Sequence, residues 1–472
     1  MILTAELLLH YQRCKRRTFL DFHGDLRARD APSDLLIKLQ QDRKAHQRTI
    51  LAEQTYHQPD YPKGNWEAGA KATLLLMQQG VDRINRGVLI TTLIGGVTLV
   101  SRPDLLIKQE GQSCFGDWIY VPAQIELGQR PKLEYQIIAA YNAHVLASVQ
   151  LADPSTAWLI LRRRQAYAVN LSKSIPQMQI VLKDCIENIQ SQQAPEVFIA
   201  RQRCSLCRWY SDCYAIAKSQ RHLSLLPGVT PTRYSQLQTL NLTSIESLTQ
   251  ASSTQMELVF GEAAAQQLIL QAQSVIQKRA ILYSSLPIPS SPIELYFDIE
   301  AEPDLKLDYL LGVLIVDRKT STGTFHSLLA ERPEDEGLVW QQFLDLVWQY
   351  PQAPIFHFCS YEVDTVKRLA KLYNTPREQV RPLLERFVDI YKQVTQTVAL
   401  PVESYALKSI ARWLGFEWRH PQSSGSQCIY WYDKWLETGD RTFLDAIQSY
   451  NEDDCRATRH VKDWLVNFSS NL

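Results

Sequence analysis

The sequence has no excess of either charge. Its 472 residues include 50 Lys and Arg and 50 Asp and Glu, so the formal net charge at pH 7 is zero. A chain without a global cationic field cannot attract nucleic acid over its whole surface, and any such binding must come from local basic patches.

Long apolar runs are also missing. No run reaches the 18 apolar residues that a membrane-spanning helix needs. The first residues, MILTAELLLHYQRCKRR, place their charges after the apolar stretch, which is the reverse of a secretory signal. Nine cysteines are an odd number at ordinary frequency and do not indicate a disulfide scaffold. We expect a cytoplasmic protein with no membrane contact.

Apolar residues make up 45% of the chain and charged residues 21%, as in ordinary globular proteins. Element order predicts an α/β multidomain protein. A first α/β domain is expected at 1–220, with helices at 2–22 and 66–86. A helical connector follows at 221–283, a linker rich in Pro and Ser at 284–293, and a second α/β domain at 294–472.

Acidic residues in the second α/β domain have the spacing of metal ligands. Asp298 and Glu300 lie two apart on an expected strand, so both carboxylates point to one face. Tyr450 and Asp454 lie four apart on an expected helix and share its face. Like charges placed together require a cation, and hard oxygen ligands favour a divalent metal.

These segments resemble the DEDD superfamily of 3′–5′ exonucleases, in the subclass with Tyr in the third motif. The resemblance covers about 290–470 and implies an RNase H-like fold. It implies two Mg²⁺ or Mn²⁺ ions held by Asp298, Glu300, Glu362 and Asp454, with Tyr450 orienting the attacking water. The second motif is looser, because Glu362 stands where the family has Asp; Asp364 is the alternative and Asp389 a supporting residue.

A second set of candidate ligands is formed by cysteines. Cys204, Cys207 and Cys213 form a C-x2-C-x5-C run, and Cys14 lies far upstream. Four thiolates hold either a [4Fe–4S] cluster or Zn²⁺. The split arrangement resembles RecB-like PD-(D/E)XK nucleases of the AddB and CRISPR-associated type, which implies [4Fe–4S] on these four cysteines.

The PD-(D/E)XK motif itself is degraded. Asp104 follows Arg102 and Pro103 as the family requires, but Glu126 is followed by Gly128 where Lys is expected. Lys132 is the candidate for a displaced lysine. Gln136 and Tyr141 resemble the Gln and Tyr of the family's next helix, and Glu67 is a candidate extra acidic ligand. Activity here and a retained DNA-binding scaffold both stay open.

Basic residues flank the cysteines and fall in one further run, so they are candidates for phosphate contacts. They are Arg13, Lys15, Arg16, Arg17, Arg162, Arg163, Arg164, Arg201, Arg203 and Arg208. The connector resembles a helix-hairpin-helix unit with Pro227, Gly228 and Val229 as its hairpin.

The whole layout resembles a family of bacterial RecB-like nucleases that join these three parts. The resemblance implies a metal-dependent nuclease acting on nucleic acid, DNA more than RNA, in a process such as DNA repair. Its C-terminal domain would be a 3′–5′ exonuclease. Its N-terminal domain would bind DNA, with DNA cutting as an open option. The competing classes are a non-catalytic nucleic-acid-binding or assembly protein that keeps both folds, and a redox sensor.

Overall fold

The computed structural model describes residues 1–162, 166–421 and 423–470. The chain divides into two compact units. Unit 1 contains Met1–Val197 and Arg201–Tyr214, and unit 2 contains Phe198–Ala200 and Ala215–Leu472. Arg163 and Arg164 of the predicted basic patch lie outside the described residues. No helix in the described ranges is both long and apolar enough to cross a membrane.

Unit 1 is built on two sheets. One has five strands in the order β2-β5-β6-β7-β8, and the other has three in the order β1-β4-β3. The strands are β1 (Ile2–Thr4), β2 (Arg83–Asn85), β3 (Leu89–Thr92), β4 (Thr98–Ser101), β5 (Leu105–Ser113), β6 (Gly116–Ile125), β7 (Ala157–Ile160) and β8 (Ala166–Val169).

The central helix of unit 1 is α5 (Leu133–Gln150), which is buried on nearly all sides and packs on β6 and α6. An apolar helix with little polar face is stable only inside a core, so α5 forms the centre of this unit. The other helices are α1 (Ala5–Arg13), α2 (Lys15–His23), α3 (Asp34–Ala52), α4 (Trp66–Gln78), α6 (Leu171–Gln190), α7 (Arg201–Cys204) and α8 (Tyr210–Ser219).

Two of the expected helices are shorter than predicted. The single helix expected at 2–22 is a strand followed by two helices, which are separated by extended backbone at Cys14. The helix expected at 66–86 ends at Gln78, and Gly80 follows with a positive φ of 69°. The hydrophobic spacing continued past both points, but the backbone at Cys14 and Gly80 is not helical.

The connector contains η2 (Leu223–Leu225), α9 (Pro231–Thr239), α10 (Ile245–Thr249), α11 (Ser253–Phe260) and α12 (Glu262–Gln277). At the expected hairpin Gly228 has a φ of 82°. The Gln271 amide on α12 donates to the Leu400 carbonyl at 2.5 Å, and Ser274 donates to the Ala399 carbonyl at 3.1 Å. The connector therefore packs on the C-terminal domain within unit 2.

The C-terminal sheet has the order β12-β11-β10-β13-β14. Three antiparallel strands precede two parallel ones, and α13 provides the crossover. The strands are β10 (Ile293–Glu302), β11 (Leu307–Asp317), β12 (Thr322–Leu329), β13 (Ile355–His357) and β14 (Phe387–Asp389). A two-stranded sheet pairs β9 (Ile281–Leu282) with β15 (Val398–Ala399).

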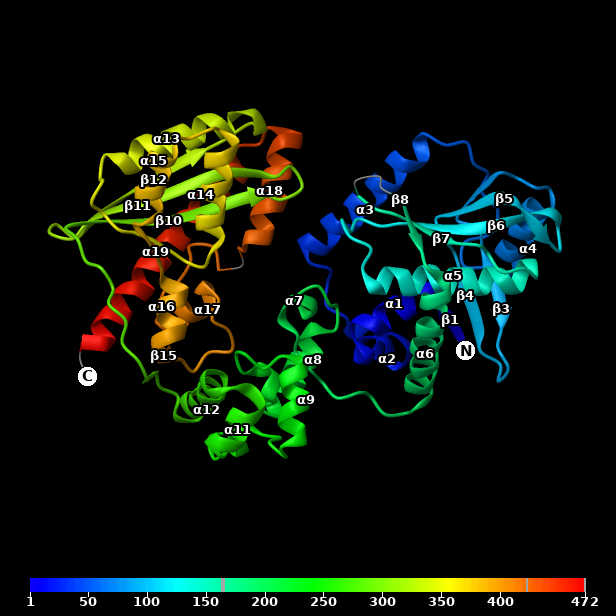
Figure 1. The fold of residues 1–472 in the computed structure, drawn as a ribbon, viewed down its shortest axis with the longest axis horizontal. Coiled ribbons are helices and arrows are strands. Elements are labelled where there is room, and N and C mark those ends of the chain that lie inside the picture. The colour runs from blue at the N-terminus through cyan, green and yellow to red at the C-terminus, as the bar shows by residue number, and fades with distance from the viewer. Residues whose placement is uncertain (163–165, 422, 471–472) are drawn as a thin grey trace. The chain divides into compact units, whose positions relative to one another are not determined.

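Helices cover both faces of this sheet (Figure 1). They are α13 (Glu336–Trp348), α14 (Tyr361–Leu372), α15 (Arg377–Leu384), α16 (Ile390–Thr397), α17 (Leu407–Trp413), α18 (Gly425–Thr438) and α19 (Thr442–Ser470). Phe297 of β10 stacks on Phe343 of α13 with ring centres 4.7 Å apart. Its neighbour Asp298 points to the opposite face and contacts α19.

Candidate metal centre

The long helix α19 is fixed on β10 by a buried ion pair. The Lys462 ammonium lies 2.7 Å from a Glu294 carboxylate oxygen, and both side chains are almost fully buried. The Tyr296 hydroxyl donates to the other Glu294 oxygen at 2.7 Å. Residues 294, 296 and 298 share a strand face because side chains alternate, so this contact also sets the position of α19 opposite Asp298.

Three carboxylates converge where β10 and α19 meet. One oxygen each from Asp298, Glu300 and Asp454 can be chosen so that all lie within 4.8 Å of one another. Glu300 is buried, and the other two side chains are half-buried. Oxygen donors at this separation match the ligands that Mg²⁺ and Mn²⁺ take in proteins.

The carboxylates of this cluster are buried close together with little positive charge nearby, and this raises their pKa values. Burial raises the pKa of Asp298, and the charges of Asp454, Glu300 and Glu362 raise it further. Burial and then Asp454 raise the pKa of Glu300. Burial raises the pKa of Asp454 to about 7, against hydrogen bonds from Trp418 and Tyr450 that lower it. A bound divalent cation would reverse these shifts.

Glu362 lies at the edge of the cluster. It is buried in the first turn of α14, and an oxygen of its carboxylate lies 3.3 Å from His357 Nδ1. Its charge reaches Asp298, whose pKa it helps to raise. The alternative residue, Asp364, is exposed on the same helix and lies 3.9 Å from Lys367. Of the two residues, Glu362 is the buried one whose charge acts on Asp298, and Asp364 is exposed.

Asp389 supports the turn that precedes Glu362 in the chain. Its carboxylate accepts the backbone N–H of Cys359 at 3.1 Å and the N–H of Lys392 at 3.2 Å. Cys359 has a φ of 80°, which is rare for a residue with a side chain. Asp389 therefore caps α16 and fixes the strained turn that leads into α14.

Three further residues contact the cluster without having been predicted. Asn451 donates to Asp298 at 2.7 Å, and Trp418 donates to Asp454 at 2.7 Å. The Lys408 ammonium lies 5.5 Å from the centre of the Tyr450 ring and favours the charged form of Asp454. Asn451 follows Tyr450 directly in the chain, but Lys408 at the start of α17 and Trp418 in an irregular segment belong to no motif.

A glycine on the neighbouring strand makes room for Asn451. Gly312 of β11 pairs with Asp298 of β10, and a methyl group there would overlap the Asn451 amide. The hydrogen bond from Asn451 to Asp298 therefore depends on the missing side chain at position 312.

The four predicted cysteine ligands all belong to unit 1. Cys14 caps α2, its sulfur accepting the Arg17 N–H at 3.4 Å. Burial raises the pKa of Cys213 to about 11, against a hydrogen bond from Arg16, and the charges of Cys207 and Cys14 raise it further. Over the residues that can be described, no three of these sulfurs lie within 4.8 Å of one another.

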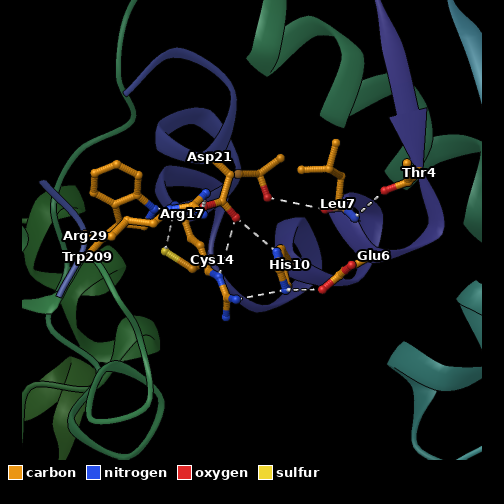
Figure 2. A network of polar contacts seen from close by, with 10 residues as sticks. Thr4, Glu6, Leu7, His10, Cys14, Arg17, Asp21, Arg29 and Trp209 are labelled. Atoms are coloured by element: carbon orange, nitrogen blue, oxygen red, sulfur yellow. Dashed lines mark hydrogen bonds and ion pairs between the residues drawn. The ribbon is translucent and has the colours of Figure 1, made fainter. Parts of the chain in front are cut away.

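Asp21 lies on α2, the helix that Cys14 caps, and contacts Trp209 in the segment of the other three cysteines (Figure 2). Its carboxylate accepts the indole N–H of Trp209 at 2.8 Å and pairs with Arg29 at 2.6 Å and with His10 at 3.0 Å. Trp209 lies between Cys207 and Cys213 in the chain. No sequence motif marks this network, because Asp21 and Trp209 lie 188 residues apart in the chain.

Several arginines of the predicted basic patch make contacts inside unit 1. Arg13 pairs with Glu134 at 2.8 Å, and Arg16 donates to the Pro195 carbonyl at 2.7 Å. Arg208 donates to the carbonyl of Asp30 at 2.8 Å. These guanidinium groups therefore hold the cysteine segment against the rest of the unit, whatever further contacts they make.

The second acidic pair lies where β5 begins and β6 ends. Asp104 accepts the Ile125 N–H at 2.7 Å and the Gln47 amide at 2.8 Å, and Glu126 pairs with Arg43 at 3.2 Å. Burial raises the pKa of Glu126 to about 7, and the Arg43 charge opposes this shift. Burial also raises the pKa of Asp104, while the Ile125 hydrogen bond and nearby arginines lower it.

The remaining residues of the predicted nuclease motif make other contacts. The Lys132 ammonium lies 5.7 Å from the centre of the Tyr135 ring. Gln136 donates to the Pro131 carbonyl at 2.8 Å, and the buried Tyr141 hydroxyl donates to the Leu3 carbonyl at 2.8 Å. Glu67 is exposed and lines a separate cavity beside β1 and β3. These contacts assign Gln136 and Tyr141 to the scaffold.

Comparison with known families identifies the C-terminal domain. Residues 295–466 match the family model described as RNase_H superfamily. No curated protein matches the chain. The prediction of an RNase H-like fold in the C-terminal region is confirmed, and this fold suggests a nuclease-type activity on nucleic acid. RNase H-like nucleases usually use Mg²⁺ or Mn²⁺, and the chain has an acidic cluster in this domain.

Proposed function

We propose that the protein is a metal-dependent nuclease whose C-terminal domain is a 3′–5′ exonuclease acting on DNA or RNA. The observation that carries the proposal is the convergence of Asp298, Glu300 and Asp454 within 4.8 Å, inside the region that matches the RNase H superfamily. Glu362 completes the proposed set of ligands. Two divalent cations held there would stabilise the charge on the attacking and leaving oxygens of phosphodiester hydrolysis.

Tyr450 has the role of orienting the attacking water. Burial and the neighbouring carboxylates raise the pKa of its phenol, so the hydroxyl keeps its proton. A neutral hydroxyl that already contacts Asp454 orients a water through a hydrogen bond rather than by removing its proton. Asn451 and Trp418 hold the carboxylates of Asp298 and Asp454, which fixes the ligand oxygens before any substrate arrives.

A direct assay tests this function. Single-stranded DNA and RNA labelled at either end would be incubated with Mn²⁺ and the full chain. We expect shortening from the 3′ end, reduced at least about 100-fold by Asp298→Ala and by Glu362→Ala, because metal-ligand loss costs several kcal/mol of transition-state stabilisation. Asp364→Ala, on the same helix as Glu362 but exposed, is the matched control and should retain activity. Equal degradation by wild type and Asp298→Ala would reject the proposal.

We further propose that unit 1 is a RecB-like domain in which Cys14, Cys204, Cys207 and Cys213 hold a [4Fe–4S] cluster. Burial raises the pKa of the Cys207 and Cys213 thiols and the charge of Cys14 raises it further, so these three side chains lie near one another. Tetrahedral Zn²⁺ with bonds of about 2.3 Å would need sulfurs about 3.8 Å apart, a tighter group than the described cysteines form. Iron and acid-labile sulfide in the purified protein would support the cluster, and zinc without iron would exclude it.

The N-terminal acidic pair supports DNA binding without cutting as the role of unit 1. Arg43 pairs with Glu126 and Gln47 donates to Asp104, so both carboxylates already have protein partners. We expect Asp104→Ala combined with Glu126→Ala to leave DNA cleavage by the full chain unchanged. A cleavage product lost in that double variant and kept in Asp298→Ala would instead establish a second active site.

A further inference from the structure

The hydroxyl of Tyr309 is a buried polar group that packing of the C-terminal domain does not explain. Tyr309 of β11 is fully buried, and within the described parts of the chain its hydroxyl has no hydrogen-bond partner. Its ring stacks on Tyr432 of α18, with the ring centres 3.9 Å apart. Phenylalanine would give the same stack without the cost of burying an unbonded hydroxyl, so this oxygen indicates a contact beyond packing.

Tyr309 lies at an irregularity in the pairing of β10 with β11. Glu300 pairs with Leu310, but the next residue, Ala301, pairs with Asp308, so Tyr309 is an extra residue of its strand. Such a bulge changes the direction of the side chains around it. Burial raises the pKa of the Tyr309 hydroxyl, and the charge of Glu300 raises it further. The hydroxyl therefore lies near the Glu300 carboxylate.

Helix α18 contacts both Tyr309 and Glu300. Cys428 and Tyr432 lie four residues apart on α18, so they share one face of the helix, and both are buried. Tyr432 stacks on Tyr309, and Cys428 forms a hydrogen bond with Glu300. One face of α18 thus holds the tyrosine ring and the proposed metal ligand together.

The proposed metal ligands differ in the donors that hold them. Asp298 and Asp454 each accept a hydrogen bond at 2.7 Å from an amide or indole N–H. Glu300 shares the Asn451 amide with Asp298 and contacts the S–H of Cys428, which is a weak donor. A phenol O–H is a stronger donor to a carboxylate, and donors placed behind metal ligands orient them.

We propose that Tyr309 is a positioning residue of the C-terminal metal centre, and that its hydroxyl donates a hydrogen bond to Glu300 when the centre holds its cation. This inference rests on the proposed nuclease function and deepens it. An ionised carboxylate has lone pairs for both a metal and a hydrogen bond, so Tyr309 would orient Glu300 without competing for the metal. The hydroxyl would therefore contribute to metal affinity rather than to folding of the metal-free protein.

Calorimetric titration of Mn²⁺ into the full chain, freed of divalent cations, measures this affinity without any nuclease activity. We expect Tyr309→Phe to weaken Mn²⁺ binding about 10-fold, the lower end of the roughly 10- to 100-fold loss typical of a missing donor behind a metal ligand. Tyr432→Phe is the matched control from the same ring stack. Its hydroxyl donates to the Ala330 carbonyl at 2.9 Å, so this variant should keep the Mn²⁺ affinity of the wild type.

Urea unfolding without metal distinguishes a positioning role from a structural one. Tyr309→Phe should unfold at the same urea concentration as the wild type or a higher one, because it removes a buried hydroxyl without breaking a hydrogen bond of the described chain. Tyr432→Phe should unfold at a lower concentration, because the buried Ala330 carbonyl loses its donor. An unchanged Mn²⁺ affinity in Tyr309→Phe, or a loss of its metal-free stability, would overturn the proposal.

The Asp298→Ala variant distinguishes the role of Tyr309 from the metal centre itself. If Asp298→Ala binds Mn²⁺ as tightly as the wild type, the proposed metal centre is wrong and the role of Tyr309 is wrong with it. If Asp298→Ala loses Mn²⁺ binding and Tyr309→Phe keeps it, the metal centre stands and only the positioning role is rejected.

Discussion

The two acidic sites of this protein differ in what surrounds them. In unit 1, Asp104 and Glu126 are met by Gln47 and Arg43 of α3. In unit 2, Asp298, Glu300 and Asp454 mainly face one another, and their pKa values are raised by burial and by mutual repulsion. Both sites bring carboxylates together in a buried setting, so the carboxylates alone do not distinguish them.

This difference supports the proposal that the metal binds in unit 2 rather than in unit 1. A divalent cation binds less favourably to an acidic pair that already contacts a guanidinium group, because the cation must first displace that group. When a cation binds to carboxylates that repel one another, it forms new coordination bonds and also reduces their mutual repulsion. The neighbours of the carboxylates, rather than their spacing, therefore separate the proposed catalytic centre from the proposed binding scaffold.

The largest expected effect in this comparison is the stabilisation of the folded protein by a bound metal. Mn²⁺ at 100 times its dissociation constant should stabilise the wild-type protein by about 2.7 kcal/mol, because it binds only the folded state. We expect Asp454→Asn to remove this stabilisation and Glu126→Gln to keep it. Thermal unfolding with and without Mn²⁺ measures the effect. The reverse order of the two variants would mean that the metal binds in unit 1.

Removal of Arg43 should change stability by less than Mn²⁺ binding does, and it should lower the stability rather than raise it. Arg43→Ala leaves the buried Glu126 without its partner and should destabilise unit 1 by about 1–2 kcal/mol, since the Arg43 side chain is 40% exposed and the pair is partly screened. Arg48→Ala, exposed on the same helix, should change stability by less than about 0.5 kcal/mol. Urea unfolding of both variants measures the difference. Equal stability would show that α3 does not neutralise the acidic pair.

The C-terminal site was the more predictable because its geometry is local. The two-residue spacing of Asp298 and Glu300 on a strand fixes a common face, and the four-residue spacing of Tyr450 and Asp454 does the same on a helix. The structure has a strand, β10, at Asp298 and Glu300 and a helix, α19, at Tyr450 and Asp454, as the spacing predicted. Residues such as Trp418 were not predictable, since 36 residues separate it from the Asp454 carboxylate that it contacts.

Helix α3 was missed for a different reason. Its buried residues are Lys38, Gln47 and Ile50, so two of the three are polar and no apolar stripe marks the helix. Gln47 and the partly exposed Arg43 of this helix contact the carboxylates of Asp104 and Glu126. Hydrophobic periodicity detects helices that pack on a core, and α3 packs instead on an acidic pair.

The last test uses the loss of folding stability at acid pH. It extends the comparison of carboxylates to Asp21. Burial raises the pKa of Asp21, but hydrogen bonds from His10 and Trp209 and the charge of Arg29 outweigh it and lower the pKa to about 2. Because the folded state binds the proton more weakly than the unfolded chain, the stabilisation is complete above about pH 4 and is lost as the pH falls to about 2.

Asp21→Asn should therefore lower the stability of unit 1 by about 1–2 kcal/mol at pH 7, after allowance for partial exposure, and flatten its pH dependence between pH 4 and 2. Asp25→Asn is the matched control, because Asp25 is exposed and its ion pair in the described part of the chain is with the nearby Arg27. Urea unfolding across this pH range measures both variants. A slope that survives in Asp21→Asn would assign the acid sensitivity to other carboxylates and remove Asp21 as the group that ties the Cys14 helix to Trp209.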